Sequence, residues 1–346
     1  MEAAPLYTDV ARAPEGGEAW WLTTSDGVRI RAATWPAATG SAAKGTVLLF
    51  PGRTEYIEKY GPAAQEYTQA GFAFLTIDWR GQGLSDHALP DPLLGHVGNF
   101  SEFQLDIAAV VNLAEWLELP KPWFLASHSM GGCIGLRALH NGLDVTAASF
   151  SAPMWGIQLS DSDRRLGWVS SIIGTALGQG GKLVPNATLE HELLTADVEN
   201  NLLTHDPEIW DFMKNQIVTH PDLTLGGVTL GWLRAALLED WRLSRMAPPS
   251  VPALAFLGKE EGIVDPAPIH ALMEKWPGGK LELVDGGRLL ANAFKRHFPY
   301  RPATRKPLPS CTCRKNALSQ GHEPLCFPSR RYPPRPPALW RALLGR

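Results

Sequence analysis

One short turn constrains the fold of this chain more than any other stretch. The apolar run Phe124–Ala126 leads through Ser127 to Ser129, and a helix-forming segment with small residues on one side begins at Met130. A strand, a tight turn and a helix in direct succession form a nucleophile elbow, which lifts a serine hydroxyl above the edge of a sheet. The pattern differs from G-x-S-x-G only at Ser127, where one small residue replaces another. Ser129 is therefore a candidate nucleophile; the alternative is a glycine-rich helix start with an incidental serine.

Strands and helices alternate on both sides of this turn. Apolar runs predict further strands at 46–50, 72–77, 145–150, 252–258 and 281–284, helical periodicity predicts helices at 57–70, 101–117 and 266–276, and a hairpin is predicted over 18–35. Ser101 is expected to cap its helix, with Gln104 completing a capping box. Such alternation is typical of an α/β fold in which helices cover both faces of a mostly parallel sheet.

The alternation fails between Ser151 and Pro249. This stretch has no clear strand signal and holds five of the 13 tryptophans. We expect a helical cap here, because the stretch begins where the carboxyl edge of the sheet opens. An all-α domain that packs its own aromatic side chains is the alternative. The predicted organisation is a first core part at 1–150, a cap at 151–249, a second core part at 250–287 and a tail at 288–346.

The tail differs in composition from the rest of the chain. The net charge is −3, yet residues 288–346 hold 13 Lys and Arg against a single acid, Glu323. High charge and many prolines predict disorder. Charge alone attracts such a segment to anionic lipid or nucleic acid. We expect an accident of composition instead, and no nucleic-acid partner.

Cysteine usage and the lack of apolar spans indicate a reducing compartment. Only Cys133 precedes residue 300, so no disulfide framework is expected. There is no run of ~18 apolar residues, and residues 1–14 lack the basic start and apolar centre of a secretion signal. We predict a cytoplasmic protein, with contact to the inner face of the membrane as a further expectation. The oligomeric state is not predicted.

No metal or cofactor is predicted. The tail brings Cys311, Cys313 and Cys326 near His322, but C-x-C spacing among so many prolines is not that of a zinc site. The chain also has no G-x-G-x-x-G after a strand and no P-loop, so no nucleotide is implied.

Several spaced motifs resemble those of the α/β-hydrolases. More narrowly, the chain is similar to the serine hydrolases that include bacterial lysophospholipase L2 and the monoacylglycerol lipases, over about residues 20–287. The motifs are F-P-G-R-T-E-Y-I-E-K-Y from Phe50, D-W-R-G-Q-G-L-S-D from Asp78, G-H-V-G-N-F from Gly95, S-H-S-M-G-G from Ser127, L-G-G-V-T-L-G-W-L from Leu225 and G-I-V-D-P from Gly262. Their common order makes the resemblance more specific than one pentad.

The resemblance implies a catalytic triad and an oxyanion hole. Ser129 matches the nucleophile and Asp265 the acid, although Asp265 also suits the N-cap of the helix that begins at Pro266. The backbone amides of Met130 and Arg53 match the oxyanion donors.

Residues near these motifs have supporting roles in the same interpretation. Glu55 and Tyr56 are expected at the mouth of the site. Asp78, Arg80 and Gly83 are expected to hold a loop near the elbow without touching substrate.

The general base is missing from its expected place. The family carries a histidine after a D-G-G-x run, and here Leu289 follows Asp285–Arg288. Leucine cannot accept a proton. The composition changes at the same point, so we consider a shifted reading frame from about Arg288 as one explanation and true divergence as the other.

Other histidines are weaker substitutes for this base. His297 could replace it, whereas we expect His270 in solvent, His322 in the tail, His128 on the far side of the turn, and His96 in a structural position or near the pocket.

Three functions follow from these observations. The first is a serine ester hydrolase acting on single-chain lipid esters, lysophospholipids or monoacylglycerols, through an acyl-enzyme. The second is a homologue impaired by the missing histidine. The third is a protein that binds anionic surfaces through its basic tail.

Overall fold

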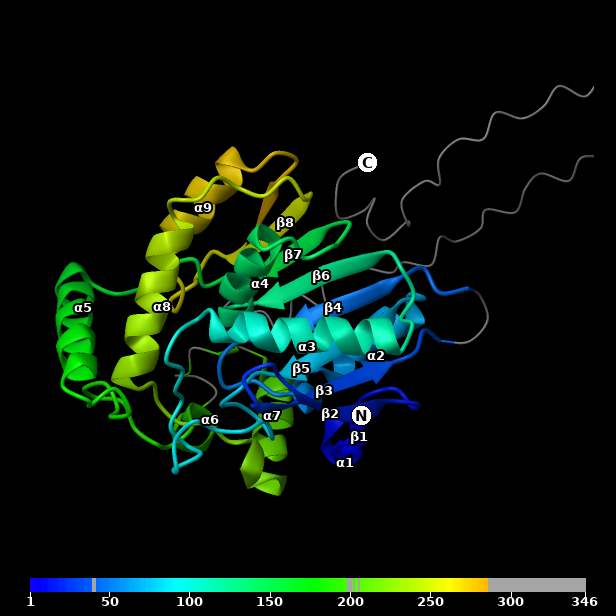
Figure 1. The fold of residues 1–346 in the computed structure, drawn as a ribbon, viewed down its shortest axis with the longest axis horizontal. Coiled ribbons are helices and arrows are strands. Elements are labelled where there is room, and N and C mark those ends of the chain that lie inside the picture. Colours follow the sequence, from blue (N-terminus) through cyan, green and yellow to red (C-terminus); the bar gives the residue numbers. More distant parts are fainter. Residues whose placement is uncertain (39–41, 198–200, 202, 205, 286–346) are drawn as a thin grey trace, which may run out of the picture.

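A twisted, mostly parallel sheet forms the centre of the protein (Figure 1). The computed structural model describes residues 1–38, 42–197, 201, 203–204 and 206–285. Within them the strand order is β1-β2-β3-β5-β4-β6-β7-β8-β9. The strands are β1 (Glu2–Ala3), β2 (Glu18–Thr23), β3 (Arg29–Trp35), β4 (Thr46–Phe50), β5 (Ala73–Asp78), β6 (Trp123–His128), β7 (Ala148–Ser151), β8 (Ala253–Gly258) and β9 (Lys280–Val284).

Strand pairing changes once across the sheet, from antiparallel to parallel at β5. The first three strands and β5 pair in antiparallel fashion, while β5, β4, β6, β7, β8 and β9 are all parallel. The predicted hairpin over 18–35 is the β2–β3 pair. Both the α/β class and the mostly parallel sheet are confirmed.

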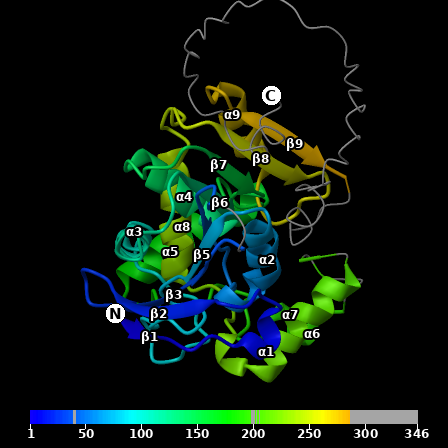
Figure 2. The ribbon, with the colours of Figure 1, turned by 90° about the vertical axis from the view of Figure 1, so that its right-hand side faces the viewer.

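Helices cover both faces of the sheet. Figure 2 shows α2 on one face and α3 with α4 on the other. The helices are α1 (Thr8–Ala11), the 3₁₀ turn η1 (Ile57–Tyr60), α2 (Gly61–Gln69), α3 (Glu102–Trp116), α4 (Met130–His140), α5 (Asp161–Ala176), α6 (Glu192–Thr195), α7 (Pro207–Thr219), the 3₁₀ turn η2 (Pro221–Leu223), α8 (Leu230–Leu243) and α9 (Pro266–Lys275).

The central strands form the core because helices cover both of their faces. All side chains of β4, β5 and β6 are buried, which explains their continuous apolar runs. Leu48 of β4 pairs in register with Leu75 of β5 and Leu125 of β6, and all three are inaccessible to solvent. Burial of each such side chain contributes roughly 1.5–3 kcal/mol. The carboxyl end of β6, which leads to Ser129, is thus rigidly supported.

Two local expectations are wrong. Ser101 makes no capping bond, because its φ of −62° and ψ of −21° are already helical and α3 begins at Glu102. The Asn99 side chain accepts a hydrogen bond from the Ser101 amide at 3.1 Å just before the helix, while Gln104 donates to the Ile134 carbonyl. The strand predicted from Val145 begins at Ala148, because the Val145 amide closes a turn onto Leu143.

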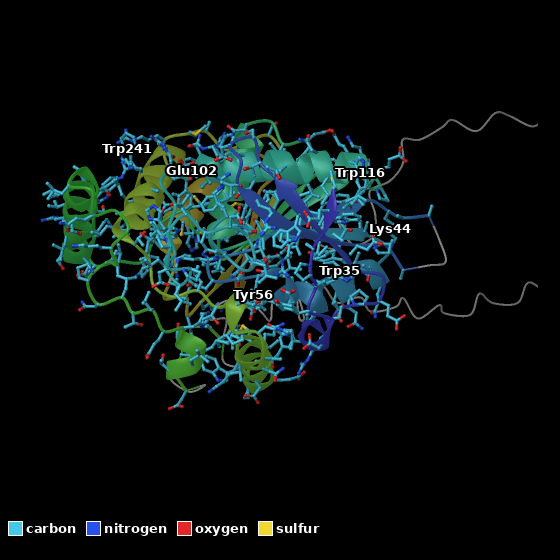
Figure 3. The ribbon with its side chains drawn as sticks, turned by 60° about the horizontal axis from the view of Figure 1, so that its bottom comes forward. Trp35, Lys44, Tyr56, Glu102, Trp116 and Trp241 are labelled. Atoms are coloured by element: carbon cyan, nitrogen blue, oxygen red, sulfur yellow. The ribbon has the colours of Figure 1, made fainter. Side chains whose placement is uncertain are left out.

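The chain between β7 and β8, here called the insertion (residues 152–252), carries α5 to α8. Figure 1 shows α5 and α8 beyond the carboxyl ends of the central strands. A second apolar cluster in the insertion includes Trp210, Phe212 and Met213, and it packs on Tyr56 of the sheet domain. Figure 3 shows Tyr56 at this junction and Trp241 on the outer surface. In the part of the chain that the structure describes, no helix has both the length and the hydropathy to cross a bilayer.

Candidate active site

Ser129 lies at a strained turn between β6 and α4. Its φ of 48° and ψ of −119° are backbone values that residues other than glycine seldom adopt. Three hydrogen bonds impose this geometry. The Ser129 amide donates to the Ser151 carbonyl at 3.0 Å, and its own carbonyl accepts from Gly132 and Met154, both at 2.8 Å. The turn therefore has the backbone form of a nucleophile elbow.

Close packing explains the small residues around the turn. A Cβ at Gly131 would lie 2.1 Å from the Phe50 carbonyl oxygen and 2.4 Å from that of Pro51. A Cβ at Gly132 would lie 2.5 Å from the Pro153 side chain. Ser127 replaces the first glycine of the pattern without conflict, because its hydroxyl donates to the Ser149 carbonyl at 3.2 Å. The end of β4 is consequently pressed against the start of α4.

The turn after β4 presents the second candidate oxyanion amide. Trp79 Nε1 donates to the Pro51 carbonyl at 2.9 Å, Gln82 Nε2 donates to the Gly52 carbonyl at 3.0 Å, and the Gly52 amide donates to Glu55. Among the hydrogen bonds within the described residues, none is donated by the Arg53 or Met130 amide. Met130 is the first residue of α4, so its amide has no partner inside the helix. Both amides remain available to an oxyanion.

Asp265 is held on the loop that follows β8. Its Oδ1 accepts from the Ala267 amide at 3.0 Å and caps α9. Its Oδ2 accepts from Nη2 of Arg164, on α5, at 3.1 Å. The Asp265 amide donates to the Gly156 carbonyl at 2.9 Å. The capping role is therefore present, and the carboxylate also has a cationic partner that sequence reasoning missed.

One short segment ties the two candidate triad residues together. The segment 151–156 begins at the end of β7. Its residues Ser151 and Met154 form hydrogen bonds with Ser129, and its residue Gly156 accepts a hydrogen bond from Asp265. Neighbouring parallel strands end at the same edge of a sheet, which is why residues 136 positions apart share one support.

None of the described histidines forms a hydrogen bond or ion pair with Ser129 or Asp265. His128 Nδ1 lies 3.0 Å from the Ser151 carbonyl, and its ring faces Glu55 with Nε2 3.7 Å from the carboxylate. Burial lowers the pKa of His128. His96 Nδ1 lies 2.8 Å from the Thr229 hydroxyl, and His270 is exposed on α9.

The remaining candidates for the base lie outside the described residues. These are His297 and His322. Leu289, where the family pattern carries its base, and the tail cysteines lie outside the described residues as well. Within the described part of the chain, no group of three side chains is placed to hold a metal ion.

Glu55 and Tyr56 lie beside the oxyanion turn. The buried Glu55 carboxylate accepts from Tyr60 and pairs with Lys59 at 2.5 Å. Burial raises the pKa of Glu55, but Lys59 and His128 outweigh that effect and hold it below its ordinary value. Glu55 and His128 also line a cavity of about 230 Å³. Tyr56 is buried and donates to Gln216 of α7 at 3.1 Å, so it fastens the insertion to the sheet domain.

Asp78 has the supporting geometry expected of a scaffold residue. Its buried carboxylate accepts from the Ile57 and Leu84 amides at 2.8 and 2.9 Å and pairs with Arg31 at 2.7 Å. Arg31 pairs in turn with Glu58 at 2.8 Å. Burial raises the pKa of Asp78 to about 6, against the opposing effect of Arg31.

Gly83 and Arg80 complete this support. A Cβ at Gly83 would lie 2.3 Å from Oδ2 of Asp78. Arg80 pairs with Asp106 at 2.8 Å and with Asp26 at 2.7 Å. The loop that carries these residues is thus fixed by buried charges near the oxyanion turn.

Two bacterial proteins are similar in sequence. Lysophospholipase L2 of Escherichia coli (strain K12) is 32% identical over 236 residues, which cover 63% of this chain and 64% of that protein. The probable lysophospholipase L2 of Haemophilus influenzae is 28% identical over 249 residues, covering 70% and 76%. The chain thus spans just under two thirds of the length of the E. coli relative.

Two solved structures share the fold. A soluble variant of monoglyceride lipase from Saccharomyces cerevisiae superposes with a TM-score of 0.59 at 18% identity, covering 77% of this chain and 86% of that one. Monoacylglycerol lipase of Paleococcus ferrophilus gives 0.55 at 20% identity, covering 74% and 89%.

A family match covers most of the chain. The Hydrolase_4 family, described as serine aminopeptidase, S33, matches residues 41–288, a range that includes the elbow at Ser129 and the loop at Asp265. The chain therefore belongs to the Hydrolase_4 family of serine hydrolases with the α/β-hydrolase fold.

Proposed function

We propose that this protein hydrolyses carboxylic esters of single-chain lipids, lysophospholipids or monoacylglycerols, through an acyl-enzyme on Ser129. The observation that carries the proposal is the strained turn at Ser129. The segment 151–156 holds both this turn and Asp265, and the amides of Arg53 and Met130 nearby donate no hydrogen bond among the described residues. The names of the E. coli and yeast relatives support a lipid ester as substrate.

In the proposed reaction, Ser129 Oγ attacks the ester carbonyl as its proton passes to an imidazole. The oxyanion that forms accepts hydrogen bonds from the Arg53 and Met130 amides. Collapse of this intermediate expels the alcohol, which takes the proton, and leaves an acyl group on Ser129. Water then attacks the acyl-enzyme by the same route and releases the fatty acid. Asp265 would orient the imidazole and stabilise its charged form.

The insertion supplies a second part of the proposal. Its helices stand beyond the carboxyl ends of the central strands (Figure 1), where substrates of open α/β sheets bind. We propose that it caps the site and accommodates the acyl chain. The cytoplasm and the inner face of the membrane, the location expected from the sequence, are part of this proposal.

Labelling with a fluorophosphonate probe tests the nucleophile. The full chain should react with the probe and hydrolyse p-nitrophenyl esters, and Ser129→Ala should abolish both. Labelling that persists in Ser129→Ala would refute the assignment. Ser162, an exposed serine on α5, provides a matched control, since Ser162→Ala should react like the parent.

The missing histidine favours a second candidate, an impaired hydrolase. Leu289 stands where the family pattern carries its base. Loss of one triad member costs on the order of 10⁴- to 10⁶-fold in rate. In that case the parent should turn over esters slowly, and Leu289→His should raise the rate. Suppose instead that the parent already turns over esters while a folded Leu289→His protein shows no increase in rate. That result would show that another group serves as base.

A further inference from the structure

Among the residues that the structure describes, the Arg53 side chain has no carboxylate partner, and it lies beside the candidate active site. Its Nη2 donates to the Gly226 carbonyl, and its guanidinium carbon lies 5.5 Å from the centre of the Trp232 ring. Nε is buried and has no hydrogen-bond partner within the described residues. No carboxylate of those residues lies within ion-pair distance of the guanidinium. Burial lowers the pKa of Arg53 to about 10, so the group is still charged at neutral pH.

Glycines of two motifs make room for this guanidinium. A Cβ at Gly95 would lie 2.2 Å from Nη2 of Arg53, so a side chain here would displace the guanidinium from its present position. Gly95 also pairs with the insertion, where its amide donates to Gly227 at 3.2 Å. The runs that begin at Gly95 and Leu225 thus form a socket for one arginine. A buried charge with no counter-charge among the described residues is unfavourable, which is unusual for a purely structural contact.

A second cation, Lys59, shares this region. Arg53 lines a small cavity with Lys59 and His191. Burial lowers the pKa of His191, and the charges of Lys59 and Arg53 lower it further. The Glu55 carboxylate on the same cavity is already engaged by Lys59 and Tyr60. Because Lys59 is paired with Glu55, the uncompensated charge among the described residues here is that of Arg53, which favours an anion.

We propose that the Arg53 guanidinium binds the phosphate of a lysophospholipid headgroup, so that this enzyme prefers lysophospholipids to monoacylglycerols. The inference rests on the proposed ester hydrolysis at Ser129. Planar guanidinium groups bind phosphate through paired hydrogen bonds. The two contacts would be of comparable reach, because about six covalent bonds join the Arg53 amide nitrogen to its guanidinium carbon, and as many join the ester carbonyl carbon to phosphorus in a 1-acyl lysophospholipid. One residue would then bind the oxyanion and the headgroup together.

Binding to the Ser129→Ala protein tests this without turnover. Short-chain lysophosphatidylglycerol and a monoacylglycerol with the same acyl chain are titrated as monomers, with tryptophan fluorescence as the readout. We expect the phospholipid to bind roughly 10- to 100-fold more tightly, the value of a hydrogen-bonded charge. Equal affinities would overturn the proposal.

Variants at position 53 assign the preference to a residue. In the Ser129→Ala protein, the further substitution Arg53→Met should remove the preference for the lysophospholipid. Arg53→Lys should retain part of that preference. Arg234→Met is the matched control, because Arg234 is also half-buried and donates to a loop carbonyl, that of Gly98. A preference retained in Arg53→Met, or lost in Arg234→Met, would refute the role of Arg53. Should Arg53→Met fail to fold, the Arg53→Lys and Ser129→Ala titrations still decide.

Two further measurements distinguish binding of the lipid headgroup from binding of free phosphate, and the phosphate site from the hydrolase activity. If glycerol phosphate alone binds as tightly as the lysophospholipid, the site takes a free phosphate and the headgroup assignment is wrong. If the parent hydrolyses neither lipid while the binding preference is present, the proposed hydrolase activity fails and the phosphate site stands.

Discussion

Arg164 of α5 donates a hydrogen bond of 3.1 Å to Oδ2 of Asp265. The candidate triad acid is therefore joined to the insertion, while its other oxygen caps α9. Both carboxylate oxygens are engaged, and the two partners have different functions. One fixes the local backbone, and the other neutralises charge.

Substitutions at Asp265 should separate capping from catalysis. Asp265→Asn keeps an oxygen that can accept from Ala267 but loses the negative charge. We expect little loss of stability and a decrease on the order of 10⁴-fold in the rate of ester hydrolysis or probe labelling. Asp265→Ala should lose the same activity and also about 1 kcal/mol of stability. Thermal unfolding and labelling rates measure the two effects, and an Asp265→Asn protein with full activity would exclude Asp265 as the triad acid.

Contact between β4 and α4 should make Gly131 intolerant of a side chain. In Gly131→Ala the new Cβ meets two backbone carbonyls, so we expect a loss of roughly 1–3 kcal/mol in the free energy of unfolding together with reduced labelling of Ser129. Gly135→Ala on the same helix is the control. Its Cβ would meet the Leu125 side chain at 3.2 Å, and a gain of about 1 kcal/mol in helix propensity offsets that contact. Equal stability of the two variants in urea unfolding would contradict this account.

Two arginines of β3 should differ in their effect on stability. Arg31 is fully buried between Glu58 and Asp78, so Arg31→Met leaves two buried carboxylates without a cation and should cost about 3–5 kcal/mol. Arg29 pairs with Asp86 at the surface, where both side chains are about half exposed. Arg29→Met should change stability by less than about 1 kcal/mol. Chemical denaturation of both proteins checks the contrast, which a small effect of Arg31→Met would negate.

His191 should make the protein less stable in mild acid. Burial, with Lys59 and Arg53 nearby, lowers its pKa from 6.5 to about 4. Between these values the unfolded chain binds the proton more tightly, so the native state loses stability as pH falls through this range. The loss amounts to about 3 kcal/mol.

A variant isolates this contribution. His191→Asn keeps an acceptor for the Leu193 amide at the start of α6 and cannot titrate. Its unfolding free energy should vary less with pH than that of the parent between about 6.5 and about 4. Parallel pH profiles for the two proteins would exclude His191 as the source.

The fold could be predicted because its signals are local. The runs that became β4, β5 and β6 are buried on both faces, so their composition alone identified strands. The turn at Ser129 was found for the same reason, since strand, turn and helix are adjacent in the chain. The cap was predicted wrongly at Ser101 because capping depends on the backbone angles of that one residue. The sequence does not show those angles, nor that the Asn99 side chain would bond the Ser101 amide.

Partnerships across long separations could not be predicted. Arg164 meets Asp265 only after the insertion has folded back across the sheet, and 101 residues separate them. Arg31, Glu58 and Asp78 come from three elements and show no shared pattern in the sequence. The Arg53 guanidinium likewise gains its importance from Gly95 and Gly226, which lie on different loops.

The segment 151–156 gives the molecule a mechanical link. It begins at the last residue of β7, bonds to the serine turn and to the Asp265 loop, and forms the start of the insertion, ahead of α5. If an acyl chain displaced the helices of the insertion, the displacement would act on the same peptide groups that hold Ser129 and Asp265. The spacing of hydroxyl and carboxylate would then respond through a few peptide units.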